Sequence, residues 1–164
     1  MTASFVLLSD ETLAAPAASM TATVDTAYRM FRVTFYGIKD GSAGALRLRL
    51  NGDSGTNYII QGLLADSTTL TGGRTSATQT SIYAPNSTLT ANNPAMFLYE
   101  IEKPLTTTPA RVTFSSAVVP GSLALGSQSA EWANTADLID EITVSASTTN
   151  FAIGSRMLIE GAAP

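Results

Sequence analysis

The strongest constraint on the fold is a two-residue alternation of apolar and polar side chains that recurs along the chain. In Leu46–Leu50 three leucines alternate with two arginines, and in Tyr28–Tyr36 the side chains of Phe31, Val33 and Phe35 share one side. Successive side chains of a β-strand point to opposite faces, so this period is typical of strands with one buried face. About eight to ten such segments occur, separated by turn residues, and no long helical pattern accompanies them. We therefore expect an all-β fold, a jelly-roll-like antiparallel β-sandwich of short strands with an extended N-terminal segment.

The composition removes several classes of chemistry. The chain has no cysteine, which excludes thiolate sites and disulfides, and no histidine, which excludes a Ser-His-Asp relay and imidazole ligands. Only 13% of the 164 residues are charged and the net charge is −4, which opposes binding to nucleic acid. No apolar run is long enough to cross a membrane, and the N-terminus lacks the basic region of a signal peptide. We expect no cofactor, no metal, no nucleic acid and no membrane partner.

The chain divides into a short N-terminal part and one domain. Residues 1–27 carry little charge and an Ala/Pro-rich middle, so they predict an N-terminal arm or an edge strand. Residues 28–164 are long enough for a single β-sandwich domain. Within it, residues 66–93 are rich in Ser, Thr, Gly and Asn and predict a loop-rich excursion, interrupted by one strand near Ser81–Ala84.

A dense turn motif follows Leu46–Leu50. Asn and Gly adopt positive φ at little cost, and a new apolar run begins at Tyr58, so the motif predicts a hairpin between 46–50 and 57–61. Its oxygen-bearing side chains could instead hold Ca²⁺, but the motif supplies a single carboxylate, and we favour the turn. The motif consists of Asn51, Gly52, Asp53, Ser54, Gly55, Asn57 and Tyr58.

Four residues are candidates for a partner interface. Arg32, Arg47 and Arg49 are expected on the outward side of consecutive strands, where they would form either a patch for an acidic partner or an ordinary solvated edge. Trp132, the single tryptophan, suggests a core or interface residue, with a sugar-stacking platform as the alternative.

A pair of carboxylates gives the only enzymatic hypothesis. Glu100 and Glu102 fall on one face of a predicted strand, roughly 7 Å apart at two strand rises, a spacing found in glycosidases. The same alternation explains them as the solvent face opposite Tyr99 and Ile101. We favour the solvent face, and hence a protein that is not an enzyme.

The order of segments resembles a widespread type of tailed-bacteriophage virion protein. The resemblance rests on Leu13–Thr21, on Tyr28-Arg29 with its strand, on Leu46–Tyr58, on Trp132 with Ile142–Val144, and on Phe151–Gly161. It implies a jelly-roll-type β-sandwich on the particle surface, acting as a capsid decoration (cement) protein or a tail component.

This resemblance and the absence of a catalytic constellation lead to one functional expectation. We expect a non-enzymatic virion structural protein, made in the cytoplasm of a bacterial host, that binds the outer capsid surface as a homo-oligomer, with a trimer favoured. The major capsid protein or other virion proteins would be its partners. The alternative is a phage tail or fibre component acting as a carbohydrate-binding adhesin.

Overall fold

The structure, a computed structural model, describes residues 4–38, 45–66, 69–83, 94–104, 107–118 and 124–163. All regular structure within these ranges is β, and no helix in them is long and apolar enough to span a membrane. Twelve strands are described, against the eight to ten that the sequence predicts. They are β1 (Val6–Thr12), β2 (Ser19–Thr23), β3 (Met30–Gly37), β4 (Leu46–Leu50), β5 (Tyr58–Asp66), β6 (Thr69–Gln79), β7 (Ile82–Tyr83), β8 (Ala95–Glu102), β9 (Ala110–Val118), β10 (Ala124–Trp132), β11 (Glu141–Ala146) and β12 (Arg156–Ala162).

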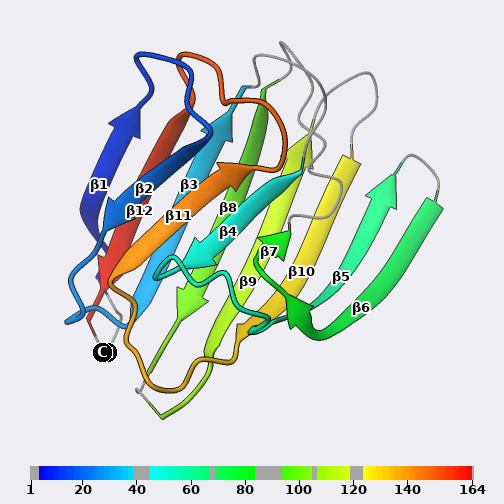
Figure 1. The fold of residues 1–164 in the computed structure, drawn as a ribbon. Helices are drawn as coiled ribbons and strands as arrows, with labels where there is room; N and C mark the ends of the chain where they lie inside the picture. Colours follow the sequence, from blue (N-terminus) through cyan, green and yellow to red (C-terminus); the bar gives the residue numbers. More distant parts are fainter. Residues whose placement is uncertain are drawn as a thin grey trace.

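The strands form two antiparallel sheets. The larger sheet has eight strands in the order β1-β12-β3-β8-β9-β10-β5-β6, and the smaller has four in the order β2-β11-β4-β7. The smaller sheet lies across one part of the larger, and the hairpin β5–β6 extends past it (Figure 1). The predicted all-β sandwich is thereby confirmed, whereas the jelly-roll connectivity stays a prediction.

The core lies between the two sheets and follows from the alternation in the sequence. In β4 the three leucines are wholly buried and the two arginines are not, and β3 buries Phe31, Val33 and Phe35 in the same way. Aromatic rings fill the centre: the Phe35 and Phe151 ring centroids are 4.8 Å apart. Each buried side chain of this size contributes about 1.5–3 kcal/mol relative to exposure, so the aromatic layer holds the two sheets together.

The predicted hairpin between 46–50 and 57–61 is wrong. The turn itself forms, since Asn51 and Gly52 have φ of 54° and 62° and Asp53 N–H donates to the Leu50 carbonyl at 3.0 Å. However, β4 pairs with β11 and β7, whereas β5 pairs with β10 and β6 in the other sheet. Leu50 and Tyr58 both point into the core, and they reach it from opposite sides only if the chain crosses between sheets.

The N-terminal part supplies both an edge strand to the larger sheet, β1, and an edge strand to the smaller, β2. Of the expected excursion at 66–93, residues 67–68 and 84–93 lie outside the described residues. The rest forms β6, an eleven-residue strand at the opposite edge of the larger sheet, and the short β7. Because β6 is rich in Thr and Gly, its own sequence carries no alternation; antiparallel pairing with β5 defines it as a strand.

Candidate functional site

A cluster of polar contacts closes one end of the sandwich, centred on Asp53 in the turn motif. One carboxylate oxygen of Asp53 accepts the Gly55 N–H at 2.7 Å, and the other accepts Asn57 Nδ2 at 2.9 Å and Trp132 Nε1 at 2.7 Å. Burial acts to raise the pKa of Asp53, but the hydrogen bonds from Trp132, Asn57 and Gly55 outweigh it and hold the pKa below its ordinary value. The cluster thus fixes the turn to the end of β10.

Trp132 is completely buried, which confirms the core alternative; its assignment to a partner interface or a sugar platform is wrong for the described structure. The ammonium group of the buried Lys103 lies 5.4 Å from the centroid of the Trp132 ring. It donates to the backbone carbonyls of Thr108 and Asn134, each at 2.6 Å. Burial lowers the pKa of Lys103, opposed by the negative charge of Asp137. Trp132 therefore lies between a cation on its face and a carboxylate at its N–H, an arrangement that sequence spacing could not indicate.

Asn51 and Tyr58, at the two ends of the turn motif, form hydrogen bonds that hold it in place. The Asn51 side chain donates to the Leu138 carbonyl at 2.7 Å and accepts the Asp140 N–H at 3.0 Å, which holds the segment entering β11. The buried Tyr58 hydroxyl accepts the Leu50 N–H at 3.1 Å and lies 3.2 Å from the Asp53 carbonyl. Burial raises the pKa of Tyr58 to about 12, so this hydroxyl remains a donor at neutral pH.

These contacts favour the turn over the calcium alternative. Both carboxylate oxygens of Asp53 accept N–H groups, and the side-chain oxygen of Asn51, Oδ1, accepts the backbone N–H groups of Asp140 and Glu141. A cation would have to displace these donors. In the part of the chain that the structure describes, no three Asp or Glu side chains gather as a metal site requires.

The expectation that the three arginines share one outward side is wrong. Arg32 lies in the larger sheet and Arg47 and Arg49 in the smaller, so they occupy opposite outer faces of the sandwich. The physical reason is the crossing between β3 and β4, which a two-residue period within each strand does not reveal. Arg47 stacks on the Tyr83 ring at 5.0 Å, and Arg49 donates to the Thr80 carbonyl at 3.0 Å, so both hold β7 to β4.

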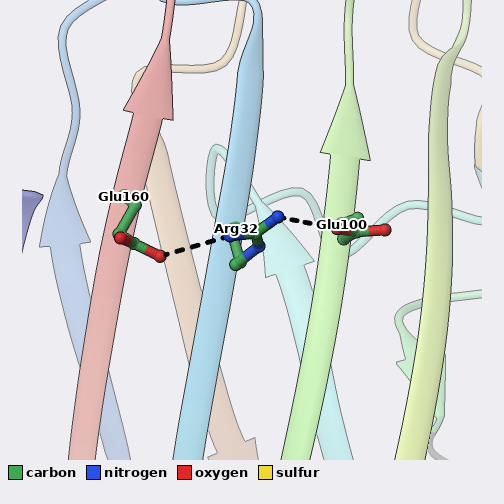
Figure 2. Close-up of polar contacts among 3 residues, drawn as sticks. All are labelled: Arg32, Glu100 and Glu160. Atoms are coloured by element: carbon green, nitrogen blue, oxygen red, sulfur yellow. Dashed lines mark hydrogen bonds and ion pairs between the residues drawn. The ribbon is translucent and has the colours of Figure 1, made fainter. Parts of the chain in front are cut away.

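Arg32 is engaged within the larger sheet. It lies between Glu100 of β8, at 3.2 Å, and Glu160 of β12, at 3.9 Å (Figure 2). The centroid of the Phe5 ring lies 4.5 Å from the guanidinium carbon of Arg32. The carboxylates of the enzymatic hypothesis, Glu100 and Glu102, are exposed on the face of this sheet that points away from the smaller sheet, here termed the outer face. Glu100 therefore takes part in a surface ion-pair ladder, the solvent-facing role that its sequence position favours.

The outer face also carries an apolar patch that sequence analysis missed. Tyr36 and Met96 are direct partners across β3 and β8, and Leu98 and Leu158 flank Thr34 one row further along. Tyr36 is 42% exposed and Met96 54%, while the two leucines are half-buried. The signal was present as apolar residues at outward positions of β3, β8 and β12, but only the pairing register brings them together. We call Tyr36, Met96, Leu98 and Leu158 the outer patch.

Among the residues that the structure describes, the charges nearest the outer patch are paired. Arg156, the cross-strand partner of Tyr36, forms a two-pronged ion pair with Asp10 of β1, at 2.8 and 2.6 Å. This contact lowers the pKa of Asp10 through its hydrogen bond with Arg156. The described charges that border the patch thus neutralise each other and do not form a field of one sign.

Comparisons with known proteins give no relative from which a function could be transferred. No protein-family model, no curated protein and no solved structure matches this chain.

Proposed function

We propose that this chain is a non-enzymatic structural protein of a tailed-phage virion, a capsid decoration protein that binds the outer surface of the shell as an oligomer. The observation that carries the proposal is the outer patch on a broad sheet face. Tyr and Met are enriched at protein interfaces, and charged residues are depleted from interface cores. A face that carries an apolar patch beside internally neutralised ion pairs suits contact with another protein.

The strand order supports the resemblance to virion jelly rolls. Leaving out the two hairpins β5–β6 and β9–β10, four of the remaining strands lie in the larger sheet in the order β1-β12-β3-β8, and the other four form the smaller sheet in the order β2-β11-β4-β7. We infer that these eight strands are a jelly roll, the double Greek key found in many capsid proteins. The two hairpins are then insertions that widen one sheet to eight strands.

Decoration would act by mass action. A protein that binds only the assembled lattice adds its binding free energy to the stability of that state, without a catalytic group. A closed symmetric oligomer, with a trimer our expectation, would multiply the contacts each copy makes with the shell. The edge strand β1 offers a second contact, because its outer backbone edge is open to pairing with a neighbour.

The test is the position of the protein on purified phage particles, by cryo-electron microscopy with copy number from quantitative gels. We expect hundreds of copies over the shell. A few copies at the tail would replace this proposal with the tail or fibre component, and absence from the particle would end the virion hypothesis.

The role of the outer patch is tested by a charge inserted at its centre. Met96→Asp should abolish binding of the purified protein to particles that lack it, whereas Ile153→Asp, at a 61% exposed apolar residue outside the patch, should bind as wild type. Equal binding by both variants would contradict the assignment of this surface. Circular dichroism of each variant checks that the sandwich is intact.

A further inference from the structure

The outer face is hollowed at the end away from the outer patch. Four adjoining depressions lie there, and neighbouring ones share lining residues: Gln61 and Ser129 join the first to the second, and Arg111 joins the second to the third and fourth. The largest, of about 690 Å³, forms where Gly72 leaves an outward position of β6 without a side chain. Together they make one shallow groove, which we call the cross-strand groove.

The cross-strand groove runs at right angles to the strands. Its floor follows one row of paired residues from Arg32 on β3 through Glu100, Thr113 and Ser129 to Gln61 on β5. Neighbouring strands are about 4.8 Å apart, so the groove is roughly 24 Å long from β3 to β6. It therefore has the shape of a site for a linear chain rather than for a compact molecule.

The chemistry of the lining is that of side chains alone. The backbone N–H and C=O groups of the interior strands are hydrogen-bonded to the neighbouring strands, so no backbone edge is open to an added strand in the groove. The groove presents hydroxyl, amide, carboxylate and guanidinium side chains, and Thr113, Ser129 and Gln61 among them are exposed. Hydroxyl and amide side chains both donate and accept, which matches a ligand whose hydroxyls do the same.

The charges of the groove are mixed. Arg111 is the cross-strand partner of both Glu102 and Glu131, but it forms no ion pair with any residue described here. It lines three of the four depressions, so its donors are available to a ligand. Carboxylates on either side of Arg111 disfavour an anionic chain. The apolar side chains of Ile59 and Leu63 at the β5 end offer surface for C–H groups.

We propose that the cross-strand groove binds a neutral, linear oligosaccharide. A polypeptide is the less favoured occupant, because an extended peptide on a sheet gains its affinity from backbone pairing, which this groove does not offer. The ligand's hydroxyls would bond to Thr113, Ser129 and Gln61 along the middle and to Arg111 and Glu102 along one wall. This site is independent of the outer patch and of any role on a capsid.

The test is a titration of the ¹⁵N-labelled protein with neutral hexasaccharides (cellohexaose, maltohexaose, chitohexaose and mannohexaose), followed by NMR chemical shifts. We expect at least one to shift the amides of β9, β10 and β5 around Thr113, Ser129 and Gln61, and the matching disaccharide to bind at least tenfold more weakly. The proposal is overturned if none of the four binds at millimolar concentration, or if the shifts fall on the smaller sheet. Tighter binding of an extended seven-residue Ser/Gly peptide at the same amides would assign the groove to a polypeptide and overturn it too.

Variants identify the groups that bind. Thr113→Val and Ser129→Ala should each weaken the hexasaccharide about fivefold, the effect of one net hydrogen bond, and Arg111→Gln about tenfold. Thr21→Val is the matched control, because this threonine is also exposed but lies on the smaller sheet, and it should leave affinity unchanged. Wild-type affinity in Thr113→Val, Ser129→Ala and Arg111→Gln alike would contradict the assignment. Met96→Asp should retain sugar binding, which separates this proposal from the one on the outer patch.

Discussion

Replacing Asp53 by alanine tests whether the turn motif contributes to the stability of the sandwich. The change removes the acceptor for three N–H donors, of which Trp132 Nε1 belongs to a side chain with no exposed surface. An indole N–H left unpaired in the interior costs about 1–3 kcal/mol, and hydrogen bonds to a charged acceptor are worth about 1.5–3 kcal/mol each. The N–H groups of Gly55 and Asn57 can form hydrogen bonds with water in the variant. We therefore expect a total loss of about 2–4 kcal/mol in the free energy of unfolding.

The assay is urea unfolding, with Trp132, the single tryptophan, as the fluorescent probe and far-ultraviolet circular dichroism as the second signal. With a slope of about 1–3 kcal/mol per molar urea, the midpoint should fall by roughly 1 M or more. Asp53→Asn keeps one acceptor oxygen and should lose about half as much. Asp140→Ala is the matched control: its side chain is exposed, and we expect a change below about 0.5 kcal/mol.

The pH dependence of stability in Asp53→Asn tests whether the Asp53 carboxylate stabilises the fold in its charged form. Because the folded pKa of Asp53 lies below its ordinary value of 3.8, the carboxylate stabilises the fold above that value, and this contribution disappears as pH falls through the folded pKa. The stability gap between wild type and Asp53→Asn should therefore be constant near neutrality and close in acid. A loss below about 0.5 kcal/mol in Asp53→Ala, or a gap that widens on acidification, would refute the reasoning.

Three further substitutions test other parts of the core. Tyr99→Phe removes a fully buried hydroxyl that has no hydrogen-bond partner among the described residues, so we expect a stability equal to wild type or up to about 1 kcal/mol higher by thermal denaturation. A clear loss of stability would show that the hydroxyl is bonded. Gly161→Ala would bring a methyl group within 2.5 Å of Leu8 Cδ1, so hydrogen exchange of β1 should quicken, and adding Leu8→Ala should restore its protection. Lys103→Met leaves the carbonyls that the ammonium bonds without a donor and should cost about 1–3 kcal/mol in urea unfolding, an effect that would be missing if water replaced the ammonium freely.

The sequence by itself determined where the strands with alternating apolar and polar residues form and which side of each of them is buried. The alternation in Leu46–Leu50 and around Phe31–Phe35 predicts β4, β3 and their inward faces, and Asn51-Gly52 predicts the local backbone of the turn. These features depend on residues a few positions apart, so they are legible in the order of the chain. The contrast is β6, whose Thr- and Gly-rich sequence carries no alternation and which becomes a strand through its pairing with β5.

Only the tertiary structure decided which strands are neighbours. A correct turn after Leu50 did not make a hairpin, because burying both Leu50 and Tyr58 in one core requires the chain to cross from one sheet to the other. The same kind of crossing puts Arg32 and Arg49 on opposite faces, and the same register assembles the outer patch and the cross-strand groove from strands far apart in sequence. A two-residue period shows on which side of its own strand a residue lies. The sheet that this side faces is set by the long-range burial of apolar surface, which no local pattern records.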